Sequence, residues 1–219
     1  MTQVAIVDLN ISNLHSVNSA CKRINLQSQI TSDKKIISDA ESIILPGVGS
    51  FSEAMSRLKA LKLEDVIKKS IQDNKPFLGI CLGMQLLFSE SSEFGKTKGL
   101  SVFNGKVKKF KFIKKNNLRY PVPHVGWNNI NINKDNFNSK NNLFKNIKNM
   151  EYMYFVHSFF VIPEDEDIIL TKTLYGEENF CSSISKNNIS AVQFHPERSG
   201  IEGLKIYKNF KSTVLKNNL

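Results

Sequence analysis

The sequence is poor in cysteine and lacks any long hydrophobic run. Its three cysteines, Cys21, Cys81 and Cys181, are widely spaced and form no Cys-x-x-Cys pair. This spacing argues against a disulfide framework and a zinc site, and we expect no metal and no other cofactor. No apolar stretch approaches the roughly 20 residues that cross a bilayer, and Asp8 interrupts the N-terminal stretch too early for a secretory signal. We therefore expect a cytoplasmic protein with free thiols and no membrane contact.

Arginine is also scarce, although the chain carries a formal net charge of +10. Most of the basic residues are lysines, and one dense run comprises Lys106, Lys108, Lys109, Lys111, Lys114 and Lys115. Val107, Phe110 and Phe112 are spaced among these lysines like the inward-facing residues of a strand. We interpret the run as the solvated side of a strand, with an acidic protein partner as the alternative, and we expect no nucleic-acid binding.

The first half of the chain alternates between two hydrophobic patterns. Strands are predicted at 4–7, 28–31, 42–45 and 76–80, and helices at 14–24, 51–61 and 63–71. Strands that alternate with helices in this way indicate a mostly parallel central sheet with helices on both faces. The fold class is therefore α/β, and the length of the chain fits a single domain over residues 1–219.

The second half has a different pattern. From residue 100 to 125, apolar residues alternate with lysines, and Gly105, Pro121 and Pro123 interrupt them. Residues 128–149 are rich in Asn and Lys and are expected to form a surface excursion. Further strands are predicted at 152–156, 168–171, 180–184 and 189–194, and a closing helix at 200–216. We expect the strands of this half to include a smaller antiparallel sheet.

Cys81 lies where a short apolar strand meets a helix. Residues 76–80 predict a core strand, and residues 84–88 predict the start of a helix. With Gly79 and Gly83 on either side, the turn resembles the Gly-x-Ser-x-Gly elbow of hydrolases, in which glycines tolerate a strained backbone and leave the nucleophile accessible. The helix N-terminus can stabilise a thiolate or an oxyanion. Alone, the pattern also fits a plain buried cysteine.

A second motif at residues 191–197 follows an apolar strand with a histidine and a carboxylate. Because side chains alternate along a strand, His195 and Glu197 can lie on the same side. A carboxylate that orients one ring nitrogen leaves the other free to exchange a proton with a thiol. Cys81, His195 and Glu197 could therefore be nucleophile, base and orienting group. An unrelated exposed His-Pro-Glu turn fits the spacing equally well.

A third motif, residues 45–51, combines a strand end, two glycines and a helix start. Backbone N–H groups in the Gly47, Val48 and Gly49 turn can hold an anion or an oxyanion, because glycine allows the backbone to come close. The same residues also fit the tight strand-to-helix turn that any parallel sheet needs.

Two of these motifs together resemble a known family. Residues 79–85 and 192–197 are similar, in order and separation, to the signature pair of the class I (triad) glutamine amidotransferases. Within that class, other segments resemble the glutaminase subunits of imidazole glycerol phosphate synthases, which act in histidine biosynthesis. These segments are 45–49, Phe51 with Ala54 and Met55, 124–128, 154–158 and 198–199. The resemblance spans nearly the whole chain and implies the fold of that class.

The resemblance implies a role for each matching residue. Cys81 would attack the side-chain amide of glutamine and form a glutamyl thioester. His195 would carry a proton to the departing ammonia, and Glu197 would orient His195. Backbone N–H groups of Leu82 and of the turn would bind the oxyanion; the turn residues are Gly47, Val48 and Gly49. Glutamine itself would be held by Gln85, His157, Ser158 and Phe159.

The resemblance also implies a partner for the ammonia. The expected partner is the cyclase subunit of imidazole glycerol phosphate synthase, a protein of barrel fold, in a heterodimer. The interface would include Asn13, Trp127, Tyr154 and Arg198. The N-terminal loop, expected to face the synthase, departs from the family motif at Leu9, Asn10 and Ser12, which leaves the partner's identity open.

Three alternatives remain at this point. A paralogous glutaminase subunit could serve a different synthase, such as a sugar-amidating enzyme. A hydrolase of the same fold could act on γ-glutamyl compounds. A binding module could carry a vestigial triad.

Overall fold

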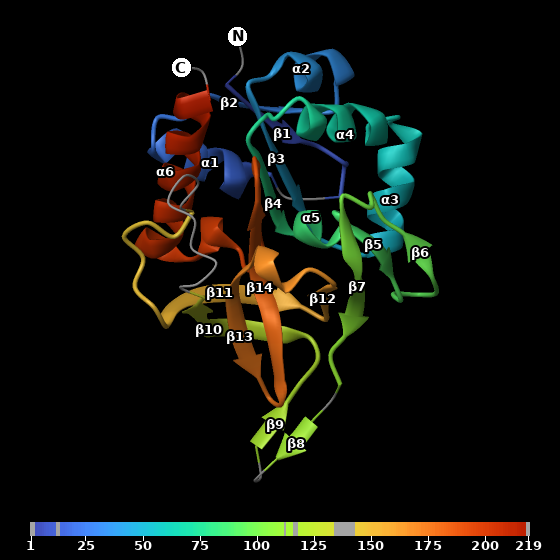
Figure 1. The fold of residues 1–219 in the computed structure, drawn as a ribbon, viewed down its shortest axis with the longest axis vertical. Coiled ribbons are helices and arrows are strands. Elements are labelled where there is room, and N and C mark those ends of the chain that lie inside the picture. Colours follow the sequence, from blue (N-terminus) through green and yellow to red (C-terminus); the bar gives the residue numbers. More distant parts are fainter. Residues whose placement is uncertain (1–2, 12–13, 112, 116–117, 134–142, 218–219) are drawn as a thin grey trace.

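A mixed sheet runs through the centre of the protein, and its first half is parallel (Figure 1). The computed structural model describes residues 3–11, 14–111, 113–115, 118–133 and 143–217. The parallel strands follow the order β2, β1, β3, β4, β15. Their bounds are β1 (Val4–Val7), β2 (Ser28–Thr31), β3 (Ser42–Gly47), β4 (Phe77–Cys81) and β15 (Ile189–Val192). This half brings the carboxyl ends of β3, β4 and β15 to one edge, as parallel strands do.

Helices pack on both faces of the parallel half, as the sequence predicts (Figure 1). They are α1 (His15–Arg23) and α6 (Gly200–Asn217) on one face and α2 (Lys34–Asp39), α3 (Phe51–Ala60) and α4 (Glu64–Gln72) on the other. Strand β1 shows how the sequence specifies this arrangement. Val4 and Ile6 pack in the cluster that contains the apolar faces of α1 and α6, whereas Ala5 and Val7 pack in the cluster that contains α3 and α4. The strand is therefore apolar on both sides.

The strands of the second half continue the sheet mostly in antiparallel pairs, starting with β14 beside β15, whereas β5 and β7 pair in parallel. They are β5 (Phe88–Ser91), β6 (Thr97–Lys98), β7 (Phe103–Lys109), β10 (His124–Ile132), β11 (Glu151–His157), β12 (Phe159–Pro163), β13 (Ile169–Tyr175) and β14 (Glu178–Lys186). A separate hairpin is formed by β8 (Ile113–Lys115) and β9 (Leu118–Tyr120). Among the described residues, no helix is long and apolar enough to cross a membrane.

The lysine run follows the predicted pattern on β7. Val107 and Phe110 are buried, and Lys106, Lys108 and Lys109 are exposed. Lys111, beyond the end of the strand, is also exposed. Phe112 and the side chains of Lys114 and Lys115 lie outside the described part. The run is thus the solvated side of a strand where the structure describes it.

Two sequence predictions need correction. The helix expected at 84–88 is only α5 (Leu82–Gln85), and Phe88 begins strand β5 instead. The backbone carbonyls of Leu86 and Leu87 accept hydrogen bonds from Leu100 and Val102, at 2.9 Å and 2.8 Å, so pairing with a distant segment overrides the local helical pattern.

The surface excursion expected at 128–149 is also wrong in part. Strand β10 continues to Ile132, with Ile130 fully buried. Farther along, Leu143, Phe144 and Ile147 join the hydrophobic core. Asn and Lys dominate the composition of the segment, so its few apolar anchors were not recognised from the sequence. Residues 134–142 are outside the described part.

Candidate active site

Cys81 occupies a strained elbow between β4 and α5. Its backbone has φ 53° and ψ −108°, outside the regions that non-glycine residues usually adopt. Close packing holds this conformation, because a Cβ atom at Gly83 would lie 1.7 Å from the carbonyl oxygen of Leu45 on β3. The predicted elbow is therefore present, with Cys81 at its tip and only 6% exposed.

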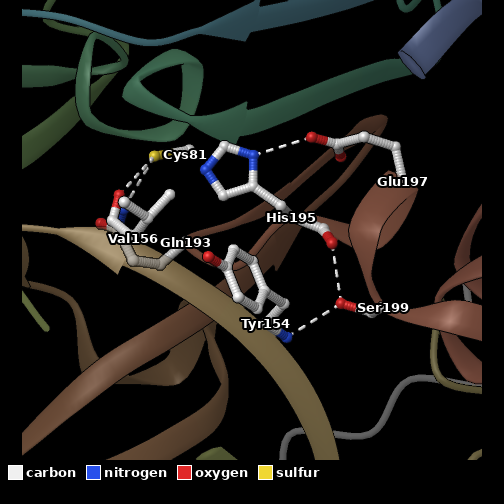
Figure 2. A network of polar contacts seen from close by, with 7 residues as sticks. All are labelled: Cys81, Tyr154, Val156, Gln193, His195, Glu197 and Ser199. Carbon is white, nitrogen blue, oxygen red and sulfur yellow. Dashed lines mark hydrogen bonds and ion pairs between the residues drawn. The ribbon is translucent and has the colours of Figure 1, made fainter. Parts of the chain in front are cut away.

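Register and hydrogen bonds place the end of β15 beside this elbow. Val192 pairs with Ile80, the residue before the nucleophile. The backbone N–H of His195 donates to the carbonyl of Tyr154 on β11, at 2.8 Å. Ser199 completes the attachment, because its hydroxyl accepts from the Tyr154 N–H at 3.0 Å and donates to the His195 carbonyl at 2.7 Å (Figure 2).

The imidazole of His195 lies between Cys81 and Glu197 (Figure 2). Its Nδ1 atom donates to Oε1 of Glu197 at 2.7 Å, and both side chains are buried. Burial by itself opposes protonation of His195, but negative charge on Cys81 and the contact with Glu197 outweigh it and raise the pKa of His195 to about 10. At neutral pH the structure therefore favours an imidazolium that faces the sulfur and is oriented by a carboxylate.

Glu197 is the middle residue of the short 3-10 helix Pro196–Arg198, and its side chain is shielded from solvent. Tyr207 of α6 is fully buried beside it. Burial, and then the neighbouring charge of Glu197, raise the pKa of Tyr207 well above its ordinary value. The tyrosine therefore stays neutral, and the negative charge in this part of the core belongs to the carboxylate.

A cavity of about 400 Å³ opens onto Cys81. Its lining comprises Val48, Gly49, Cys81, Leu82, Gln85, Glu93, Pro123, Val156, His157, Ser158, Phe159 and Arg198. The structure thus brings most of the predicted substrate and oxyanion residues to one cavity. Gly47 is the exception: it ends β3, pairs with Cys81 and is buried behind the lining. The turn still lies against the nucleophile, and its backbone at Gly49 has φ 97°, which favours glycine.

Sequence reasoning missed two polar side chains of this site. Glu93 contributes a carboxylate to the cavity and accepts a hydrogen bond from the N–H of Phe51 at 2.7 Å. No motif pointed to it. Gln193 donates from Nε2 to the sulfur of Cys81 at 3.5 Å. The available signal was its position two residues before His195 in a segment predicted as a strand, although β15 itself ends at Val192.

Three of the four predicted interface residues lie close to the cavity. Trp127 on β10 is 55% exposed, and Tyr154 packs edge-on against it. The guanidinium of Arg198 lies 5.3 Å from the centre of the Tyr154 ring. Asn13, the fourth predicted interface residue, falls outside the described residues.

The three residues that depart from the family motif near the N-terminus do not share one environment. Leu9 is 1% exposed and packs in the core. The residue type at this position is therefore constrained by core packing and not by contact with a partner. Asn10 is exposed. Ser12 lies outside the described residues.

Comparison with known proteins agrees with this geometry. The family model described as glutamine amidotransferase class-I matches residues 5–213. The chain belongs to the class I glutamine amidotransferase family. Among solved structures, it is similar to a glutamine amidotransferase crystal structure, with TM-score 0.73 and 15% identity over 97% of this chain and 98% of that one. It is also similar to the glutaminase domain of CTPS from Trypanosoma brucei, with TM-score 0.66 and 18% identity over 99% and 94% of the two chains.

Curated relatives place the chain within that family. It is 46% identical to imidazole glycerol phosphate synthase subunit HisH of Pyrococcus furiosus, covering 96% of this chain and 99% of the relative. The HisH subunit of Methanocaldococcus jannaschii is 47% identical, covering 94% and 97%. The Aquifex aeolicus subunit is 41% identical, covering 95% and 96%.

Proposed function

We propose that this chain is the glutaminase subunit of an imidazole glycerol phosphate synthase, hydrolysing glutamine to glutamate and ammonia for a cyclase partner in histidine biosynthesis. The observation that carries the proposal is the imidazole of His195 held between Cys81 and Glu197 (Figure 2), with Cys81 in the lining of a cavity. The names of the relatives favour this synthase over a sugar-amidating one. The assembled triad argues against a binding module in which those residues are vestigial.

In the acylation step, the sulfur of Cys81 attacks the side-chain carbonyl carbon of glutamine. Negative charge moves to the carbonyl oxygen, where the N–H of Leu82 and the N–H groups of the Val48 and Gly49 turn would stabilise it. The imidazolium of His195 then gives its proton to the amide nitrogen. The carbon–nitrogen bond breaks, ammonia departs and a glutamyl thioester remains on Cys81.

Deacylation follows from the loss of charge on the sulfur. Once Cys81 is a thioester it no longer carries negative charge, so one of the two influences that raise the pKa of His195 disappears. The His195 ring is then neutral and can accept a proton from water, while Glu197 keeps the ring in place. Attack of the resulting hydroxide on the thioester carbon releases glutamate and restores the thiolate and imidazolium pair.

Other lining residues would hold the substrate. Glu93 places a carboxylate in the cavity, where the α-ammonium group of glutamine needs a negative partner. Both amide hydrogens of Gln85 are used within the protein, so its Oε1 atom is left to accept from the substrate. His157 is neutral, because burial lowers its pKa to about 3, and with Ser158 and Phe159 it would shape the cavity rather than exchange protons.

The cyclase partner would dock on the outer side of β10 and β11. Side chains directly opposite in an antiparallel pair point the same way, and Trp127 pairs with Tyr154. Large apolar side chains exposed here and on β13 are Val125, Trp127, Tyr152 and Leu174. Their clustering next to the cavity is typical of a surface that another protein covers. We also propose a cytoplasmic location, which suits the three free and buried cysteines.

We expect the isolated chain to hydrolyse glutamine slowly and the cyclase, with its ribulosyl nucleotide substrate, to accelerate it by about tenfold or more. Loss of one oxyanion donor costs a factor of this size or greater, and the exposed Val48 turn lies where a partner can adjust it. Glutamate release by the chain alone and with the cyclase measures the effect. Trp127→Ala should reduce the acceleration, whereas Leu215→Ala, at the far end of α6, should not. Rapid turnover by the isolated chain that the partner leaves unchanged would contradict the proposal.

A further inference from the structure

The sulfur of Cys81 has a second polar neighbour besides the triad. Gln193 follows the last residue of β15 and has no exposed surface. Its Nε2 atom lies 3.5 Å from Sγ and donates to it (Figure 2). On the same side, Sγ lies 3.9 Å from the carbonyl oxygen of Val156. The sulfur therefore has one neighbour that favours a negative charge, the amide N–H, and one that would instead accept from a neutral S–H group.

Neighbouring groups hold the Gln193 amide in one orientation. Gln85 donates from Nε2 to the carbonyl of Phe159 at 2.9 Å and to Oε1 of Gln193 at 3.0 Å. Reversing the Gln193 amide would set two NH₂ groups against each other and turn an oxygen toward the sulfur. Reversing the Gln85 amide would set its oxygen against the Phe159 carbonyl. Only one arrangement satisfies all of these buried groups, and in it Gln193 must donate to Sγ.

The chain of polar contacts continues to strand β10. Nδ1 of His157 donates to the same Phe159 carbonyl at 2.8 Å, which leaves its Nε2 as an acceptor. Nδ1 of His124 lies 3.2 Å from that atom and donates to it. Burial lowers the pKa of His124 to about 4, so this ring is neutral and its Nε2 accepts from Asn128 at 3.4 Å. The half-buried Asn128 therefore donates to His124, His124 donates to His157, and His157 donates to the Phe159 carbonyl, which also accepts from Gln85.

We propose that Gln193 is a further residue of the catalytic site: its side-chain amide donates to the Cys81 thiolate, and Gln85, itself oriented by the Phe159 carbonyl, keeps it in the donating orientation. The inference rests on the proposed function, because it assigns a group that acts on the same nucleophile. Gln193 is not part of the cavity lining, so it acts on the sulfur and not on bound glutamine.

The test compares the full-length chain with Gln193→Met, which keeps the length of the side chain but cannot donate. Iodoacetamide alkylates thiolates, and its rate at Cys81 at neutral pH is followed by mass spectrometry of the peptide. Burial raises the pKa of Cys21 to about 11 and that of Cys181 further, so neither competes. We expect alkylation and kcat to fall about tenfold with KM unchanged, since hydrogen bonds to charged groups are worth roughly that factor.

Two further variants keep the test decisive. Gln193→Glu is similar in shape but places a carboxylate against the sulfur, so it should slow alkylation at least as much; it serves if the methionine variant does not fold. Ser190→Ala removes a buried polar group on the same strand that bonds to Ser185 rather than to Cys81, and it should leave the rate unchanged.

The outcomes separate this inference from the proposed function. If the parent chain is labelled at Cys81 by a glutamine-analogue electrophile, and folded Gln193 variants are alkylated within about twofold of the parent, Gln193 has no role on the sulfur. A fall in kcat accompanied by a matching rise in KM would also overturn the inference, because it would indicate disturbed binding. If the parent chain itself is not labelled at Cys81, the proposed function fails instead.

Discussion

Cys81→Ala is expected to abolish glutamine-dependent synthesis in the complex with the cyclase, while synthesis from added ammonium salt continues. The variant has no nucleophile, so the thioester cannot form. Removing the nucleophile of comparable triads costs about 10⁴-fold or more in rate. The cyclase would still receive ammonia from the buffer, because nothing in its own chemistry requires Cys81. Glutamate release and imidazole product, each measured with glutamine and with ammonium salt, check the two halves of this expectation.

Cys181→Ala is the matched control for this variant. Cys181 is another buried cysteine, but it lies on β14 with its sulfur against the carbonyl of Ser183. The Cys181→Ala substitution should lower the free energy of unfolding somewhat and leave both reactions intact. Loss of the ammonium-dependent reaction in Cys81→Ala would mean that the cysteine supports assembly with the cyclase rather than glutamine chemistry. Retention of the glutamine-dependent reaction would contradict the assignment of the nucleophile.

Gly83→Ala is expected to destabilise the protein by about 3 kcal/mol or more, the upper range for overpacking a well-packed core. The new Cβ would clash with the backbone carbonyl of Leu45. A backbone group cannot relieve the clash by changing rotamer, as a flexible side chain can. Relief would require α5 to move away from β3, which would also displace Cys81 from His195. Denaturant unfolding should therefore show a lower midpoint with an unchanged slope, and glutaminase activity should be lost.

Gly95→Ala serves as the comparison for Gly83→Ala. Gly95 has φ 109° and open space around its Cβ position, so the substitution introduces backbone strain without a clash. Strain of this kind costs about 1–3 kcal/mol, and Gly95 is not part of the cavity lining, so activity should persist. If Gly83→Ala is no more destabilising than Gly95→Ala and keeps its activity, close packing does not hold the elbow.

The sequence alone predicted the parallel half of the fold well, because its signals are local. The four-residue apolar run Val4–Val7 coincides with a whole strand, and the weaker pattern at Ser28–Thr31 also coincides with one. Strand β5 was missed, because the partners that convert Phe88 from helix to strand lie more than ten residues farther along the chain. Hydrophobic periodicity carries no information about such pairings. The single domain over residues 1–219 stays a prediction.

The residues of the site that belong to sequence motifs could be predicted from the sequence. Cys81, His195 and Glu197 were recognised as a set, and the structure brings them together by pairing β15 with β4. The role of Gln193 was not recognised, because it depends on how its amide is turned, and that depends on Gln85 from another element. Contacts between side chains from separate strands are set by the assembled fold, so sequence spacing could not specify them.

If this chain is the glutaminase subunit proposed above, the nitrogen of the imidazole product should come from the amide of glutamine rather than from ammonium in the solvent. The most direct test supplies the complex with ribulosyl nucleotide and with glutamine whose side-chain amide carries the heavy nitrogen isotope, in a buffer that contains unlabelled ammonium. Mass spectrometry of the imidazole product then reports the source of its nitrogen. We expect a product far more enriched than the ammonium pool. A product whose enrichment only matches that pool, or that carries no label while glutamate accumulates, would contradict it.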